Sequence, residues 1–504
     1  MAEKTVRSLR GALLCAAGNE ALYLIAAFCC ASVLNMGPLA WYREATDMFF
    51  SLIVVPWGAA LCLLTLERRA RLSPPRVRAD LAVLLALFLW ILVPFAIRFG
   101  ITFNTAYSWY NHLVLFFGVY AAVTQADSAH FERVIDLACA LFAALSFALG
   151  IPAVRAVLAA GTVGPETGGI AFGLDAENFL SFGLHYNTTG MIAVCCALFS
   201  LAGVCRRKNP LARLAHLAAF LLMALCVVLS QSRTSRYALL GALAVGCFGF
   251  AGARLPIRHV AMRHAAALCG ALVVLVSSYA GASTLTGTAL LHYARTQAGS
   301  ADVGAARSPS LSAQELLVSS ARAEEPRNSA SGAREEAPPA ETAQDEPAQL
   351  VPAARPAIDA TFSERTLLWR NLFALWKREP KRFILGNGMG NTGSLILSGT
   401  AYENTGGIAV HNGYLQFIAD YGIIGFALLA AFLLMLLPAA LRVLLSPQSR
   451  GGDRVFVMLA AAQLLTALME SQPLGAMSST SLALFFSLAV IRVRDATLRG
   501  VALL

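Results

Sequence analysis

AVHNGYLQFIADYG, residues 409–422, connects a long polar region of this chain to an apolar run that continues to residue 445. Asn412 is a favourable N-cap, because its side-chain oxygen can accept hydrogen bonds from the first free amides of a helix. The sequence therefore predicts a helix that begins after Asn412 and enters the apolar run. His411 then precedes the cap, beside the positive end of the helix dipole, which favours a neutral imidazole over the cation.

His411 has two interpretations. An imidazole can gain or lose a proton near neutral pH, so a neutral His411 is suited to act as a general base. Alternatively, the ring occupies the start of a helix and has no chemical role. The rest of the sequence has to separate these hypotheses.

Composition indicates the class of protein. Of the 504 residues, 57% are hydrophobic and 13% are charged, and the mean hydropathy is +0.63. Apolar runs repeatedly reach the roughly 20 residues that a helix needs to cross a bilayer. The formal net charge of +10 comes from basic residues in short loops, which indicate membrane topology and not nucleic-acid binding. We therefore predict an all-α, polytopic membrane protein.

Twelve membrane spans are predicted from these runs. They lie near residues 18–36, 48–66, 79–98, 108–124, 131–151, 187–205, 212–230, 236–254, 263–282, 421–445, 454–471 and 475–493. The spans divide the chain into a nine-span bundle over 1–282, an extracytoplasmic region over 283–420 and a three-span bundle over 421–504.

Clusters of basic residues follow the second, sixth, eighth, tenth and twelfth predicted spans. They lie at 67–71, 76–78, 206–208, 254–263, 442–454 and 492–499, and the N-terminal tail adds Lys4, Arg7 and Arg10. Basic loops are retained on the cytoplasmic side of a membrane. Both termini are therefore predicted inside, and 152–186, 230–236 and 283–420 are predicted outside. This topology places His411 at the outer face of the cytoplasmic membrane.

The outer region 283–420 has two parts. Residues 298–360 hold ten acidic residues and five arginines among many alanines and prolines, a composition that predicts a disordered insertion. Its alternative role is as a docking segment for an extracytoplasmic partner. Residues 361–420 are predicted to be ordered and helical. Ser363 can cap a helix that Pro380 ends, and the glycine-rich segment 386–390 follows.

Arg233 and Arg236 lie near the outer end of a predicted span, against the usual preference for basic residues inside. Charge at that depth is costly unless the side chain is paired or faces a wet cavity. One interpretation is that both side chains reach toward lipid headgroups. The other is a permanently charged, forked clamp for pyrophosphate, to which Arg365 of the outer region can contribute.

In order along the chain, these motifs resemble the O-antigen ligase and polymerase superfamily. The hallmark segment of that superfamily is similar to His411-Asn412-Gly413-Tyr414-Leu415 followed by 421–425. Its other segments are similar to Ser232-Arg233-Thr234, to Ser363-Glu364-Arg365 with Trp369, to 386–390, and to Tyr186-Asn187-Thr188-Thr189-Gly190. The likeness extends from about residue 180 to 445, and the acidic insertion departs from it.

The resemblance implies a membrane glycosyltransferase of the GT-C type that uses neither a metal nor another cofactor. Such enzymes move a glycan from undecaprenyl pyrophosphate to a hydroxyl acceptor at the outer face of the inner membrane. By this resemblance His411 is the catalytic base. The expected substrate-binding residues are Arg233, Arg236, Arg365, Asn412, Tyr414 and Asn187. Arginines are the appropriate counter-charge for a departing pyrophosphate.

Several alternatives stay open. A ligase uses a lipid-anchored core sugar once, whereas a polymerase of O-antigen or exopolysaccharide extends repeat units. A single large outer region before the tenth span favours the ligase. A chain that ends at Leu504, soon after the twelfth span, is unlike the relatives that glycosylate protein. A lipid or solute transporter would show internal repeats or broken spans, and a membrane scaffold would be favoured only by the acidic segment.

Overall fold

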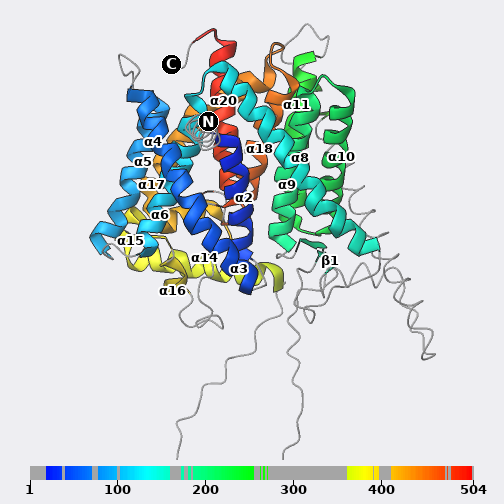
Figure 1. Ribbon diagram of the computed structural model, residues 1–504. Helices are drawn as coiled ribbons and strands as arrows, with labels where there is room; N and C mark the ends of the chain where they lie inside the picture. The colour runs from blue at the N-terminus through cyan, green and yellow to red at the C-terminus, as the bar shows by residue number, and fades with distance from the viewer. Residues whose placement is uncertain are drawn as a thin grey trace, which may run out of the picture.

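Figure 1 shows the computed structural model of the protein, a bundle of helices with shorter helices across one end. The structure describes residues 19–36, 40–70, 78–98, 103–158, 172–174, 180–182, 186–254, 262, 265–266, 269–270, 360–389, 391–396, 410–471, 474 and 478–501. The predicted ninth span, 263–282, and the predicted insertion, 298–360, lie largely outside these residues.

Helices make up nearly all of the described chain. In the first half they are α2 (Glu20–Met36), α3 (Ala40–Phe49), the π-helix η1 (Phe50–Val54), α4 (Val55–Ala70), α5 (Ala79–Arg98), α6 (Phe103–Leu113), the π-helix η2 (Val114–Ala121), α7 (Ala122–Thr124), α8 (Ser128–Leu158), α9 (Tyr186–Arg206), α10 (Pro210–Leu229) and α11 (Arg233–Arg254). Then follow α14 (Ala360–Arg378), α15 (Pro380–Leu385), α16 (Thr392–Ile396), α17 (Gly413–Leu445), α18 (Gly451–Thr466) and α20 (Ser479–Leu498).

Six of the described helices are long and apolar enough to cross a membrane. They cover Ala45–Arg68, Ser128–Arg155, Tyr186–Arg206, Pro210–Leu229, Arg233–Gly252 and Gly413–Leu445. This confirms a helical protein with several membrane-type helices, and the count of twelve spans stays a prediction. The helix over Tyr186–Arg206 is the most enclosed of the six, with 83% of its apolar window buried, so α9 forms the centre of the bundle.

Three local features differ from the sequence prediction. A short antiparallel hairpin, β1 (Phe172–Leu174) and β2 (Leu180–Phe182), lies in the predicted outer loop. The amide of Phe182 donates to Thr189 Oγ1 at 3.2 Å, which ties the hairpin to the start of α9. Helix α8 continues through Pro152 to Leu158, beyond the residue near 151 where the predicted span ends. Helix α14 begins at Ala360, so Ser363 does not cap it.

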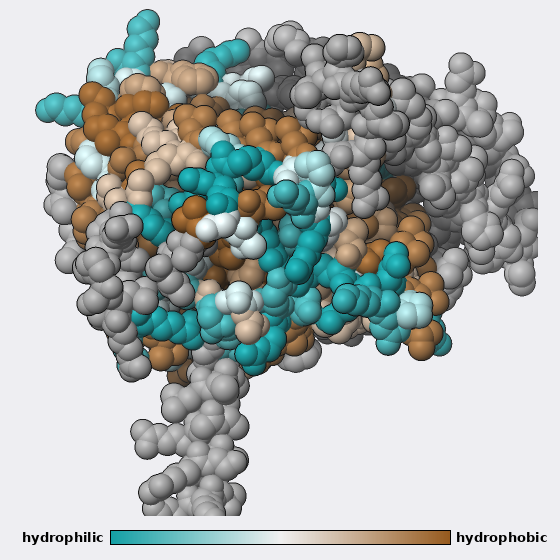
Figure 2. Space-filling model, turned by 90° about the horizontal axis from the view of Figure 1, so that it is seen from above, coloured by the Kyte–Doolittle hydropathy of each residue, from teal (hydrophilic) through white to brown (hydrophobic). Residues whose placement is uncertain are grey.

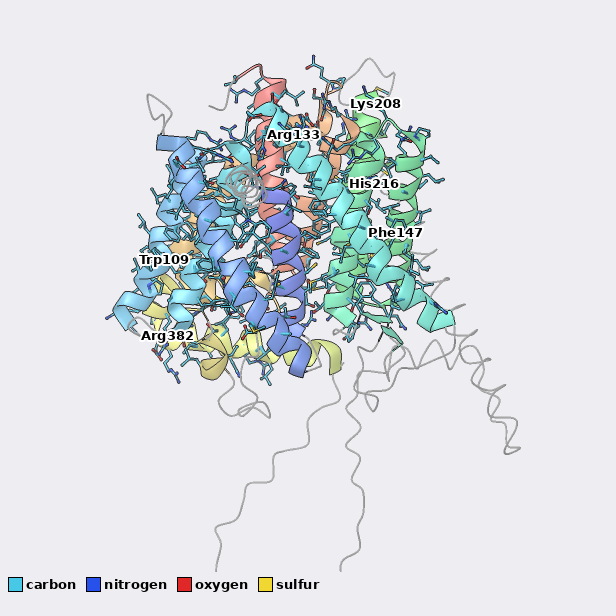
Figure 3. All side chains as sticks on the ribbon, in the orientation of Figure 1. Trp109, Arg133, Phe147, Lys208, His216 and Arg382 are labelled. Atoms are coloured by element: carbon cyan, nitrogen blue, oxygen red, sulfur yellow. The ribbon has the colours of Figure 1, made fainter. Side chains whose placement is uncertain are left out.

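Buried ion pairs join the helix ends at one end of the bundle. Arg206, in the last turn of α9, lies 2.6 Å from Glu132 of α8, and Arg494 of α20 lies 2.7 Å from the same carboxylate. Arg494 also lies 2.9 Å from Asp453 of α18. We call Glu132, Arg206, Asp453 and Arg494 the ion network. In Figure 3, Arg133 and Lys208 mark this end, and Arg382 marks the opposite one.

Seen from this end, the molecule has a polar middle. Figure 2 shows hydrophilic residues across the middle of the face, with hydrophobic residues at its border. The other end is covered by α14, α15 and α16, which lie across the bundle (Figure 1). The two ends of the bundle are therefore built differently, and the residues around His411 belong to the covered end.

Helix α17 is broken at Gly422, whose φ of +73° and ψ of +174° are not helical. The carbonyl oxygens freed there are taken up by other segments. Ala419 O and Asp420 O accept from the amides of Asn387 and Gly388, each at 2.8 Å, and Tyr421 O accepts from Trp90 Nε1 at 2.8 Å. A Cβ on Gly422 would lie 2.1 Å from Ile384 O, so only glycine fits. The glycine-rich segment after α15 thus fixes the angle at which α17 enters the bundle.

Candidate active site

His411 lies immediately before α17. Asn412 caps the helix as predicted, because its side-chain oxygen accepts from the amides of Tyr414 and Leu415 at 3.1 and 3.0 Å. The backbone of His411 is left-handed, with φ of +52°, a conformation that non-glycine residues seldom adopt away from constrained sites. Its side chain is 41% exposed, and Nδ1 lies 3.9 Å from Glu470 Oε2. One edge of the ring is therefore accessible, and the other faces a carboxylate.

The segment after His411 is fixed to the end of α18. The amide of Gly413 donates to Ala467 O at 2.7 Å, Asn412 Nδ2 donates to Leu468 O at 3.0 Å, and Tyr414 OH donates to Leu464 O at 2.9 Å. Contact of Asn412 and Tyr414 with substrate stays a prediction, because the polar atoms seen here bind the backbone of α18 and the turn after it. These bonds hold His411 beside the turn that contains Glu470.

The residue before His411 is held from both sides. Trp369 Nε1 of α14 donates to Val410 O at 2.9 Å, and the amide of Val410 donates to Gln416 Oε1 at 2.9 Å. Gln416 Nε2 in turn donates to both carboxylate oxygens of Asp420 at 3.0 and 3.1 Å. The strained backbone at His411 is thus imposed by hydrogen bonds to its neighbours, as expected where a side chain must be aimed.

Arg365 approaches the same carboxylate from α14. Its Nη2 lies 3.8 Å from Glu470 Oε1, and its Nη1 lies 4.0 Å from Met469 Sδ. The structure therefore brings His411 and Arg365, two of the predicted site residues, to opposite oxygens of one glutamate. Sequence reasoning missed Glu470 because two helices, α17 and α18, separate it from His411 along the chain. Its only signal was an acidic residue at the outer end of a predicted span.

The other predicted residues lie at the starts of α9 and α11. Arg233 begins α11, is exposed and forms no ion pair with any acidic residue that the structure describes. Arg236 Nη2 donates to Val228 O at 2.9 Å. A Cβ on Gly190 would lie 2.5 Å from Ser235 Oγ, so the first turn of α9, which contains Asn187, packs on the start of α11.

Contacts between α11 and α18 relate these two groups of residues. A Cβ on Gly241 would lie 2.4 Å from Leu465 Cδ1, two turns along α11 from Arg233 and next to the end of α18. Helix α11 therefore begins at the end of the bundle where Glu470 follows α18. The structure places Arg233, Arg236 and Asn187 at the same end as His411, without a direct contact to it among the described bonds.

A further basic side chain lies at the covered end. Arg382 Nε lies 2.5 Å from Glu379 Oε2, and its Nη1 donates to Asn387 Oδ1 at 3.1 Å. The hydrogen bond from Arg382 holds the pKa of the Glu379 carboxyl below its ordinary value.

Among the described residues, no three His, Cys, Asp or Glu side chains gather closely enough to hold a metal ion. Independence from metals stays a prediction.

Comparison with known proteins identifies one family. Residues 218–430 match a family model described as O-Antigen ligase. The matched residues run from within α10 to within α17, and they include Arg233, Arg236, Arg365 and His411 but neither Asn187 nor Glu470. No curated protein matches the chain.

Proposed function

This chain belongs to the O-antigen ligase and polymerase superfamily, and on that premise we propose that it transfers a glycan from undecaprenyl pyrophosphate to a hydroxyl acceptor. The observation that supports the proposal best is the group of His411, Glu470 and Arg365 at one end of the bundle. It combines a base with an accessible edge, a carboxylate behind that base and a permanent cation. These are the groups that glycosyl transfer from a pyrophosphate requires.

The reaction forms one bond and breaks another. The acceptor oxygen attacks the anomeric carbon and loses its proton to His411, which therefore acts as the general base. The bond between that carbon and the pyrophosphate oxygen breaks, and the pyrophosphate leaves with the electron pair. Pyrophosphate is a stable anion once it is matched by fixed positive charge. The protein therefore needs no acid to protonate the leaving group.

The arginines of the site receive the leaving group. A guanidinium presents two parallel donors to phosphate oxygens and stays charged at every physiological pH. Arg365 contacts the same glutamate as His411, on its other oxygen, and Arg233 projects from the start of α11 as an exposed cation. Together with Arg236, they form the clamp of the proposed donor site, and Asn187 at the start of α9 adds a polar contact.

The proposed architecture is GT-C-like, with the site at the extracytoplasmic face of the inner membrane. Basic clusters at the ion-network end support this orientation, since such clusters stay in the cytoplasm. Of the two reactions in the superfamily, we favour the ligase, which transfers a complete glycan to a lipid A-core acceptor. The supporting feature is that the outer sequence is concentrated in one region before α17.

Reconstitution of the purified protein tests the proposal. The assay supplies an undecaprenyl-pyrophosphate-linked glycan with or without lipid A-core, and gel electrophoresis follows the products. His411→Ala should lower turnover by about 10²–10⁴-fold, the typical contribution of a general base, and leave the melting temperature unchanged. His130→Ala, at the opposite end and beside Glu20, is the control histidine and should retain turnover.

Two results would contradict the proposal. Wild-type turnover in folded His411→Ala would make the histidine structural. Lengthening of the lipid-linked glycan without lipid A-core would show that the protein is a polymerase of repeat units and not a ligase.

A further inference from the structure

Glu470 lies between the side chains of His411 and Arg365 without a hydrogen bond to either. Its Oε2 lies 3.9 Å from His411 Nδ1, and its Oε1 lies 3.8 Å from Arg365 Nη2. Charge-assisted hydrogen bonds between nitrogen and carboxylate oxygen span about 2.7–2.9 Å, so both contacts are about 1 Å too long. Glu470 is nonetheless enclosed, with a side chain only 10% exposed.

One polar atom at each of these two contacts lacks a bonded partner. His411 Nδ1 and Glu470 Oε1 are buried and form no hydrogen bond with any residue that the structure describes. Leaving a buried polar atom unsatisfied is costly, and native proteins contain few such atoms. Hydrogen bonds of catalytic groups are often long in the free enzyme and shorten when substrate binds. The open geometry therefore indicates a contact that forms during the reaction.

The backbones of the participants are already in place. The amide of Glu470 donates to Thr466 O at 2.9 Å, and Asn412, next to His411, is bonded to Leu468 O. The neighbouring side chains of Asn412 and Tyr414 carry no charge. Among the described residues, Glu470 is the charged group that faces the ring, and Arg365 faces the other oxygen of that carboxylate. Only side chains have to move for the carboxylate to reach either partner.

We infer that Glu470 is the positioning residue of His411. Binding of the donor frees the Glu470 carboxylate from Arg365 and lets it bond to the imidazole. This inference rests on the proposed function. A pyrophosphate carries more negative charge than a carboxylate and accepts both prongs of a guanidinium, so the donor draws Arg365 away from Glu470. The carboxylate then accepts the Nδ1 hydrogen of His411 and turns the proton-free Nε2 toward the acceptor.

The proton transfer is balanced in this arrangement. Nε2 takes the proton of the acceptor hydroxyl, and the resulting imidazolium is stabilised by Glu470, which keeps its negative charge throughout. The imidazolium later releases the proton to solvent. Because the base is oriented only after Arg365 has moved to the donor, the acceptor is activated only when a donor is present.

Kinetics of purified Glu470→Gln test the inference. The turnover number should fall about tenfold or more, a part of the contribution of general base catalysis. The donor KM should stay equal or decrease, because Arg365 no longer has a competing partner. Arg365→Gln should show the opposite pattern: the donor KM should rise, and the turnover number should fall less than in Glu470→Gln. Glu470→Asp retains the charge and should restore part of the turnover.

Matched controls come from the same end of the molecule. Glu379→Gln removes a carboxylate that also binds arginine, and Arg370→Gln removes an exposed arginine of α14. Both should leave turnover and donor KM unchanged.

Three results would overturn the inference or its premise. Wild-type turnover in Glu470→Gln, with His411→Ala inactive, would refute the role of Glu470 and leave the proposed function intact. A rise in donor KM with lowered melting temperature in both Glu470 variants would make the residue structural. Full activity in His411→Ala would remove the proposed function itself.

Discussion

The two ends of the helix bundle hold their buried charges at different distances. At the ion-network end, Glu132 lies 2.6 Å from Arg206 and 2.7 Å from Arg494, and Asp453 lies 2.9 Å from Arg494. At the covered end, Glu470 stays 3.8 and 3.9 Å from its two neighbours. Closely paired charges commit their groups to each other and link four helices. In the network the Arg206–Asp453 pair is also open, at 3.6 Å, but each carboxylate has an arginine nitrogen within 2.9 Å. Glu470 has no such close partner among the described residues, so its hydrogen-bonding capacity is left for a ligand.

Arg494→Met should separate stability from activity most strongly. Removing one partner of a buried ion pair costs about 3–5 kcal/mol. Without Arg494 the buried Asp453 loses its partner at 2.9 Å, whereas Glu132 keeps Arg206. We expect a clearly lower melting temperature in detergent and normal turnover per folded molecule, because the change is at the end opposite to His411.

Arg450→Met is the matched control for this change. Arg450 contacts the same Glu132 at 3.1 Å, but its side chain is 67% exposed, and exposed pairs contribute about 1 kcal/mol or less. Equal melting temperatures for the two variants would show that the ion network does not stabilise the fold. A selective loss of turnover in folded Arg494→Met would show that the two ends are coupled.

Local patterns predicted much of the covered end. The N-cap at Asn412 followed from one residue type before an apolar run, and it is confirmed. The sequence predicts Arg233 between the end of one apolar run and the beginning of the next, and in the structure it is the first residue of α11. Such features depend on neighbours in sequence, so a single chain displays them.

Contacts between distant segments could not be predicted in the same way. Glu470 meets His411 because α17 and α18 are antiparallel neighbours held by bonds from Gly413 and Asn412. The glycines after α15 looked like a weak loop motif, yet they lie against the break at Gly422. No periodicity encodes these pairings, because they depend on how the helices pack. The site was therefore predicted in its parts and not in its arrangement.

Gly422→Ala, at the covered end, should lower the free energy of unfolding by less than Arg494→Met does. Unlike Arg494→Met, it should also reduce activity. The φ of +73° and ψ of +174° at Gly422 lie in a region open almost only to glycine, where another residue costs about 1–3 kcal/mol. The close approach of Ile384 O adds about 1–3 kcal/mol of overpacking. The break also sets the direction of the segment that starts at His411. We expect both a lower melting temperature and lower turnover.

Gly500→Ala separates the two causes. Gly500 has a similar φ of +63°, but a Cβ there meets nothing within 4 Å, so only backbone strain applies. It should lose little stability and no turnover. If Gly422→Ala behaves in the same way, the contact between the glycine-rich segment and α17 does not position the site.

Substitution of Arg233 should have the smallest effect of these changes. It tests whether charges at the covered end act on the donor and not on stability. Unlike the arginines of the ion network, it is exposed and makes no ion pair with a described acid, so its removal should not destabilise the fold. If it binds the donor pyrophosphate, Arg233→Ala should raise the donor KM about tenfold, which corresponds to about 1.4 kcal/mol. Arg233→Lys should restore only part of this loss, because an ammonium keeps the charge and lacks the fork. Arg213→Ala, an exposed arginine near the start of α10, is the control and should leave the donor KM unchanged. An unchanged donor KM in Arg233→Ala would assign this arginine to the membrane surface and restrict the anion site to the neighbourhood of Arg365.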